Sequence, residues 1–302
     1  MFWKKKNKAM EGSEQNGSPL SAINLSVVVK TDLGCVRNNN EDSAAAIYRA
    51  DEPSGKKKGH LLVVADGMGG HNAGEVASAM AVEIIGREYF KHPGHGREKI
   101  LGNALHIANK EIYEKATTHA QYQGMGTTCT ALAVVDCEIY YAHAGDSRAY
   151  HYRNNSVTRI TEDHTFVQEL VNNGSITAAE ADTHPQRNIL TNAMGTKPAL
   201  KVDTGKYARL LDPGDRLLIC SDGLYDYLDD HEIAAMLSYP SLQHCTDQLI
   251  AEAKKRGGAD NITVVLAAAA NASLSTPPKT TRDVMVPKLT RDAALPLNQN
   301  GL

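Results

Sequence analysis

Short apolar runs separated by turn residues recur along most of the chain, a pattern that indicates β-strands. Seven of these runs are rich in β-branched or aromatic residues or alternate between apolar and polar positions. We predict strands at residues 24–30, 60–66, 128–136, 138–145, 147–153, 215–222 and 261–269.

Three other segments carry apolar residues at helical spacing, so we predict helices there. They lie at residues 72–90, 99–116 and about 241–255. The expected inward stripes consist of Val76, Ala77, Met80, Ala81, Ile84 and Ile85 in the first helix and of Ala104, Leu105, Ala108 and Ile112 in the second.

The order of these elements favours an α+β fold with antiparallel sheets, because strands follow strands and helices come in groups. The strands within residues 127–152 are joined by turns too short for the crossovers that parallel strands need. We therefore expect a layered sandwich of two sheets with helices outside, and not a doubly wound parallel sheet.

The chain divides by composition into three parts. Residues 1–22 are polar and rich in Gly, Ser, Asn and Lys, which predicts disorder. Residues 23–270 form the expected globular body, without internal repeats, and its segment 165–201 is irregular with short helical pieces. Residues 271–302 contain four prolines and scattered charges, so we expect a flexible tail, with a docking segment as the alternative.

Charge and cysteine content narrow the classes of function. The formal net charge of -3 leaves no excess positive charge for nucleic acid or a membrane surface. No apolar run approaches the ~20 residues that span a bilayer, and no apolar core follows the basic start, so we expect no secretion signal. Five cysteines without a CxxC pair indicate a reducing compartment, which predicts a cytoplasmic protein, with Cys129 and Cys220 buried.

Four chain reversals carry an aspartate: Asp66, Asp146, Asp222 and Asp260. A single Asp-Gly pair is usually only a turn. Here Asp66 and Asp222 directly follow apolar runs, so their carboxylates are expected where buried strands end. Several carboxylates gathered at one such edge form an oxygen-only site of high negative charge, which suits Mg²⁺ or Mn²⁺.

A polar segment near the start adds candidates for phosphate chemistry. The planar guanidinium of Arg37 matches phosphate oxygens, and Glu41 and Asp42 are candidates to orient metal-bound waters. An exposed polar loop between strands is the alternative.

The glycine-rich loop around His71 is a further candidate. Gly69, Gly70 and Gly74 surround this histidine, and such loops before a helix can bind phosphate through backbone N–H groups or simply allow a tight turn. His71 is a candidate proton donor, with a surface or capping residue as the alternative.

Several other catalytic motifs are missing from the sequence. It has no GxxxxGK[ST] phosphate loop, no HExxH zinc helix and no GxSxG elbow. No cysteine is followed six positions later by arginine, which argues against a phosphatase that uses a thiolate nucleophile.

Eight ordered motifs make the chain resemble the bacterial PPM/PP2C-type metal-dependent protein serine/threonine phosphatases. They are TDLGCVRNNNED, VVADGMGGHNAGEVAS, GMGTTCTAL, AHAGDSRAY, TEDHT, HPQRNILTNAMG, ICSDGLYD and GGADNITVV, and they span about Thr31 to Leu266. The resemblance implies a four-layer αββα sandwich, in which helix pairs flank two antiparallel sheets, with a metal cluster at one end. It also implies that segment 165–201 is a flap that influences substrate choice.

Position by position, the resemblance implies roles for individual residues. The implied ligands of two Mn²⁺ or Mg²⁺ ions are the bridging Asp66, the carbonyl of Gly67, Asp222 and Asp260, with Asp146 and Asp222 at a weaker third site. Arg37 is the implied phosphate clamp, and Glu41 and Asp42 are the implied water-holding acids. The eukaryotic branch has a proposed acid, a histidine, where this chain has Met68. The proton donor is therefore open between His71, a metal-bound water at the third site and bulk water.

The implied activity is dephosphorylation of phosphoserine and phosphothreonine in proteins by direct attack of a metal-bridging hydroxide. We expect a monomer whose partners are a serine/threonine kinase and the phosphoproteins that this kinase makes. Two alternatives are a catalytically weak module that binds phosphoproteins and a phosphatase of a small metabolite. The presence of Asp66, Asp222 and Asp260 disfavours the first alternative.

Overall fold

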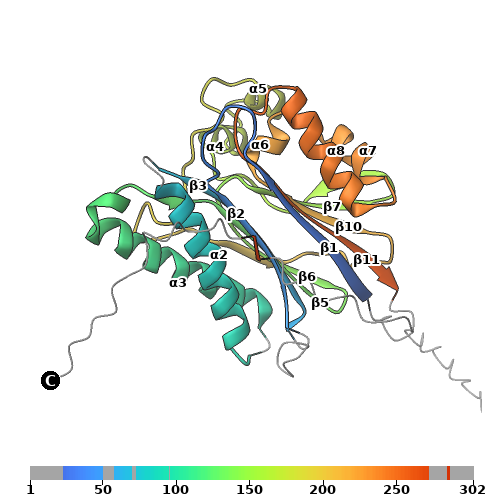
Figure 1. Cartoon of the computed structure of the whole chain (residues 1–302), viewed down its shortest axis with the longest axis horizontal. Helices are drawn as coiled ribbons and strands as arrows, with labels where there is room; N and C mark the ends of the chain where they lie inside the picture. Colours follow the sequence, from blue (N-terminus) through green and yellow to red (C-terminus); the bar gives the residue numbers. More distant parts are fainter. Residues whose placement is uncertain (1–22, 50–57, 70–72, 95, 272–283, 286–302) are drawn as a thin grey trace, which may run out of the picture.

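The computed structural model describes residues 23–49, 58–69, 73–94, 96–271 and 284–285. Within these ranges two antiparallel sheets lie face to face, with helices on both outer faces (Figure 1). The expected α+β fold, a four-layer αββα sandwich, is confirmed.

The first sheet has five strands, in the order β1, β11, β10, β7, β8. Their bounds are Ile23–Asp32 for β1, Ile262–Asn271 for β11, Arg216–Cys220 for β10, Arg148–Arg153 for β7 and Ser156–Arg159 for β8. The pairing of β1 with β11 runs from Ile23 opposite Asn271 to Asp32 opposite Ile262. It places the end of the first strand next to the turn that carries Asp260.

The second sheet has seven strands, with β12, β2, β3, β5, β6 and β9 in order and β4 paired to β3. Their bounds are Val284–Met285 for β12, Asp42–Tyr48 for β2, His60–Met68 for β3, Gly126–Thr127 for β4, Cys129–Val135 for β5, Glu138–Ala144 for β6 and Asp203–Lys206 for β9. β12 belongs to the segment predicted as a flexible tail, and it pairs with β2. Most of that segment lies outside the described residues, so its flexibility stays a prediction.

Helices cover both outer faces. α2 (Ala73–Lys91) and α3 (Arg97–Thr118) lie on the second sheet, and α6 (Asp222–Tyr225), α7 (Asp230–Leu237) and α8 (Leu242–Lys255) lie on the first. The irregular segment contains α4 (Phe166–Asn172) and α5 (Ala178–Asp182), and a short 3-10 helix spans Ala120–Tyr122. Among the helices that the structure describes, none is both long and apolar enough to cross a bilayer.

The central strands read as continuous apolar runs because both of their faces are buried. In β3, Leu61, Val63 and Ala65 face α2 and α3, whereas Leu62 and Val64 face the other sheet. The inward stripes predicted for the first two long helices are buried or partly buried against the sheet.

The five cysteines are all free thiols. Cys129 and Cys220 are fully buried, as predicted, and Cys35 is exposed. Burial raises the pKa of Cys129 and Cys220, so neither thiol is an effective nucleophile.

Candidate functional site

Asp66 lies near the end of β3, where Thr127 and Thr128 hold its backbone. Its amide donates to Thr128 Oγ1 (3.0 Å), and its carbonyl accepts from the Thr128 amide (2.8 Å) and from Thr127 Oγ1 (2.9 Å). Gly67 follows and lies close to α2, since a Cβ at this position would lie 2.3 Å from the carbonyl oxygen of Gly74. The sheet therefore fixes the Asp66 backbone, and only glycine fits beside it.

Asp222 begins α6, directly after β10. The next residue, Gly223, packs so closely that an added Cβ would lie 2.0 Å from the carbonyl oxygen of Asn261. Within the described residues, Oδ1 of Asp222 is buried and has no hydrogen-bond partner. Such an oxygen is costly unless a donor or a cation neutralises it, so it marks the place where we expect a bound ion.

The turn that carries Asp260 is attached to the loop between β1 and β2 through the side chain of Asn261. Asn261 Nδ2 donates to the carbonyls of Leu33 (3.1 Å) and Asn39 (3.0 Å), and its Oδ1 accepts from the Glu41 amide (2.8 Å). Asn261 thereby holds this loop, which contains Arg37 and leads into Glu41 and Asp42, against the Asp260 turn.

Arg37 and Asp42 lie in or directly after the loop between β1 and β2, next to the carboxylate cluster. This cluster consists of Asp66, Asp146, Asp222 and Asp260. Arg37 Nη2 lies 2.7 Å from Asp260 Oδ2, and the Arg37 side chain is 51% exposed. Asp42 stands opposite Asp66 in the pairing of β2 with β3 and accepts a hydrogen bond from Ser221 Oγ (2.8 Å). Strand pairing thus brings a predicted water-holding acid next to the predicted bridging ligand.

Glu41 is half-buried between the start of β2 and the first turn of α2. A Cβ added to Gly74 would lie 2.9 Å from Glu41 Oε2, so a side chain larger than glycine at position 74 would displace the carboxylate. Burial raises the pKa of Glu41, partly offset by the charge of Arg37. The role of Glu41 as a water-holding acid stays a prediction.

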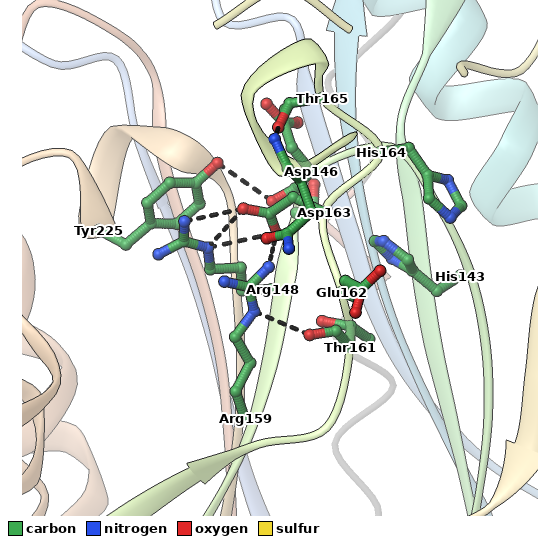
Figure 2. A network of polar contacts seen from close by, with 12 residues as sticks. His143, Asp146, Arg148, Arg159, Thr161, Glu162, Asp163, His164, Thr165 and Tyr225 are labelled. Carbon is green, nitrogen blue, oxygen red and sulfur yellow. Dashed lines mark hydrogen bonds and ion pairs between the residues drawn. The ribbon is translucent and has the colours of Figure 1, made fainter. Parts of the chain in front are cut away.

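Asp146 lies in the turn between β6 and β7 and is 6% exposed. Figure 2 shows the polar network around it. The Tyr225 hydroxyl donates to the Asp146 carbonyl (3.1 Å), the Arg148 guanidinium carbon lies 3.5 Å from the centre of the Tyr225 ring, and Arg148 forms an ion pair with Asp163 (2.8 Å). These contacts fix the backbone of Asp146 through Tyr225, which is itself held by Arg148, and so they position the Asp146 side chain.

Burial raises the pKa of Asp42, Asp66, Asp146 and Asp222, and neighbouring negative charges raise it further. Asp66 has a pKa well above its usual range because of burial and then the charges of Asp42 and Asp222. The pKa of Asp222 is raised by burial and then by Asp146 and Asp260. Burial also raises the pKa of Asp42 to about 6 and that of Asp146 to about 7. The cluster therefore gains stability from any positive charge placed among these carboxylates.

The donor set fits a hard divalent cation. It consists of carboxylate and carbonyl oxygens, which Mg²⁺ and Mn²⁺ prefer, and it includes the unpartnered Oδ1 of Asp222. In the described part of the chain, no three Asp, Glu, His or Cys side chains converge on one point at metal-binding distance. Asp260 accepts a hydrogen bond from Arg37, and Asp42 accepts one from Ser221.

We expect the melting temperature (Tm), measured in a chelator, to fall as pH rises from 6.5 to 8. Asp146 has a folded-state pKa of about 7, and the pKa values of Asp66 and Asp222 are also raised. All three therefore exceed the pKa of ~3.9 of Asp in an unfolded chain. Their stabilising contribution is full below that value and is lost as pH rises through the folded pKa. Burial lowers the pKa of His60 and His143 to about 4, so their contribution to stability increases as pH rises. This increase is complete above pH ~6.5, the pKa of an unfolded histidine.

Calorimetry across this pH range, with chelator and with Mn²⁺, checks this prediction. Mn²⁺ should flatten the slope, because a bound cation favours the ionised carboxylates. A chelated protein whose Tm rises between pH 6.5 and 8 would contradict a mutually repelling cluster.

His71 and Gly70 lie outside the described residues, so the proton-donor role of His71 stays a prediction. On the described side, Met68 ends β3, and Gly69 has a φ of +148°, a conformation that glycine adopts readily.

Two residues with structural roles at the site were not singled out from the sequence. Asn261 links the Asp260 turn to the β1–β2 loop, and His164 hydrogen-bonds the turn before Asp146. Their place in the motifs GGADN and TEDHT was the available signal, but their partners lie far away in the sequence.

Comparison with known proteins identifies the family. The family model described as protein phosphatase 2C matches residues 39–266. A phosphatase 2C-type protein of Streptococcus pyogenes is 41% identical over 246 residues, which cover 80% of this chain and 96% of that protein. The serine/threonine protein phosphatase PstP of Mycobacterium tuberculosis is 39% identical over 243 residues, which cover 80% of this chain and 45% of PstP.

A solved structure agrees with these sequence matches. The catalytic domain of PstP in complex with two manganese ions has a TM-score of 0.70 and 36% identity, covering 82% of this chain and 99% of that one. The fold, the order of the motifs and these matches agree, and the chain belongs to the protein phosphatase 2C family.

Proposed function

We propose that this protein hydrolyses phosphoserine and phosphothreonine in proteins with the help of two Mn²⁺ or Mg²⁺ ions. The observation that carries the proposal is the buried carboxylate cluster around Asp66 and Asp222, with an unpartnered oxygen on Asp222 and Arg37 at its exposed edge. Family membership supports the same chemistry.

The proposed ligands of the two ions are Asp66, the carbonyl of Gly67, Asp222 and Asp260, with Asp146 and Asp222 at a third site. When bound, such ions lower the pKa of a coordinated water and neutralise phosphoryl charge. Glu41 and Asp42 accept hydrogen bonds from waters in the site and orient them.

Arg37 binds phosphoryl oxygens with its guanidinium, which is exposed enough to meet a substrate. The transition state of phosphoryl transfer is loose, so positioning and charge neutralisation supply most of the catalysis. A covalent phosphoenzyme is not needed, in agreement with the buried thiols of Cys129 and Cys220.

We further propose that the physiological partners are phosphoproteins and the serine/threonine kinase that modifies them, and that the protein acts as a cytoplasmic monomer. The cysteine content, with an odd number and no CxxC pair, supports a reducing compartment.

Two substrate classes separate the proposal from hydrolysis of a metabolite. We expect a phosphothreonine peptide to be hydrolysed with a higher kcat/KM than a sugar phosphate, each assayed with MnCl₂. A chelator should abolish both activities, and added Mn²⁺ should restore them, because the nucleophile is generated at the carboxylate cluster. Turnover of the sugar phosphate alone would favour a metabolite substrate, and turnover that survives chelation would contradict the metal-dependent mechanism.

A further inference from the structure

His164 occupies a junction of three parts of the molecule. It immediately precedes segment 165–201, it is 5% exposed, and its ring lies 4.9 Å from that of His143. Figure 2 shows both histidines beside the Asp146 network, on the side away from Tyr225. The proposed chemistry gives this buried imidazole no task.

The first contact of His164 is with the backbone of Gly145, the residue before Asp146. The Gly145 amide donates to His164 Nδ1 (3.1 Å), and the Gly145 carbonyl accepts from the His164 amide (2.7 Å). Gly145 has a φ of +113°, and a Cβ there would lie 2.5 Å from Cβ of Thr128. The turn of Asp146 is therefore bonded to His164 and packed closely against Thr128.

The second contact is with the last part of the irregular segment, residues 191–201, which we call the returning leg. Asn192 Nδ2 lies 2.9 Å from the same His164 Nδ1, and the Thr191 amide donates to the His164 carbonyl (2.9 Å). Asn192 is itself fixed to the Lys201 backbone by hydrogen bonds of 2.9 and 3.1 Å. One ring nitrogen thus serves both the turn of Asp146 and the leg that contains Asn192.

The third contact, with Asp203, agrees with a single tautomer of the His164 ring. A backbone N–H can only donate, so Nδ1 has to accept and the ring proton is on Nε2. Nε2 lies 2.9 Å from Asp203 Oδ2 at the start of β9, where this proton is donated. A carboxylate that fixes one imidazole nitrogen sets the role of the other.

We infer that His164 is a positioning residue that fixes the Asp146 carboxylate relative to the returning leg of segment 165–201. The inference rests on the proposed function, in which Asp146 is a ligand of the weaker metal site. Because Gly145 and Asn192 share one acceptor, displacement of Asn192 changes the hydrogen bond that holds the turn of Asp146. Contacts of a substrate with this leg would therefore alter the third site.

Two conservative variants separate this role from plain packing. In His164→Asn the amide oxygen lies near the place of Nδ1, so it can accept from Gly145 and Asn192. In His164→Gln the amide lies near the place of Nε2, so it can meet Asp203 but not Gly145. A packing role predicts that the two variants lose activity equally. The positioning role predicts that His164→Asn retains activity and His164→Gln loses it.

The experiment measures kcat and KM for a phosphothreonine peptide, Mn²⁺ binding by calorimetry, and Tm. We expect His164→Gln and Asn192→Ala each to lower kcat about 10- to 100-fold, the range found when residues that support metal ligands are changed. Both should also weaken the weakest Mn²⁺-binding event. His164→Asn should retain most of the activity and binding, and the double variant should be no worse than either single variant, because both act at one acceptor.

His151→Asn is the matched control. His151 is also fully buried and lies 3.0 Å from a carboxylate, that of Asp215, but it lies within β7 of the first sheet. It should lower Tm without changing the Mn²⁺-binding profile.

Equal losses in His164→Asn and His164→Gln that follow Tm would overturn the inference, as would additive effects in the double variant. A wild-type protein that binds Mn²⁺ without hydrolysing the peptide would contradict the proposed function alone, and the binding data would still test His164.

Discussion

Asp222→Asn is expected to lower kcat/KM for a phosphothreonine peptide about 10³-fold or more while the fold persists. Metal-ion catalysis supplies several kcal/mol of transition-state stabilisation, and each 1.36 kcal/mol corresponds to about tenfold in rate. Asn keeps the size of Asp222 but removes the charge from a carboxylate whose buried Oδ1 has no partner. The loss therefore affects ion binding and leaves core packing unchanged.

Thermal unfolding distinguishes this effect from damage to the fold. The charge of Asp222 raises the pKa of Asp66, so its removal relieves repulsion, and the chelated variant should be at least as stable as the wild type. The rise in Tm that Mn²⁺ causes should shrink, because a ligand stabilises the folded state in proportion to its binding. Near-normal, Mn²⁺-dependent turnover by Asp222→Asn would show that the ligand assignment is wrong.

Asp136→Asn provides the matched control for this substitution. Asp136 lies in the exposed turn between β5 and β6 with a φ of 55°, a conformation that Asn also tolerates. Its activity and its response to Mn²⁺ should equal those of the wild type.

The sequence predicts the long central elements well, because their burial leaves a strong pattern. β2 was missed, since its run of three alanines has low strand propensity and follows a polar loop. It is a strand because β3 pairs with it along its whole length. The first turn of α7 carries a capping box of Asp229 and Glu232, a recognisable signal that an eight-residue helix makes easy to overlook.

The candidate site divides in the same way between local and long-range information. Aspartates in turns after apolar strands can be recognised locally, and in the structure the charges of Asp146, Asp222 and Asp260 all raise the pKa of Asp66. Their role as ligands of one metal site stays a prediction. The connections that hold them cannot be read locally, because Asn261 bonds Leu33 across 228 positions. Strand register, which sets Asp42 opposite Asp66, is likewise a property of the folded sheet.

Arg37→Ala is expected to lower kcat/KM about 100-fold, the loss typical for a donor that stabilises charge in a transition state. It should also weaken inhibition by inorganic phosphate, since the guanidinium would contact the phosphate that remains after hydrolysis. Arg37→Lys should fall between the wild type and the alanine variant, because an ammonium keeps the charge but loses the planar fork. Rates with varied phosphate concentration measure both effects.

The ion pair of Arg37 with Asp260 allows a second explanation, which the same data separate. If Arg37 only neutralises Asp260, which lies 2.7 Å away, then Arg37→Ala frees a metal ligand, tightens Mn²⁺ binding and leaves phosphate inhibition unchanged. Arg87→Ala is the control, because Arg87 forms an equally short ion pair with Glu111 (2.7 Å) at similar exposure on the outer helix layer. Loss of phosphate inhibition in the Arg37 variant alone would assign the guanidinium to the substrate.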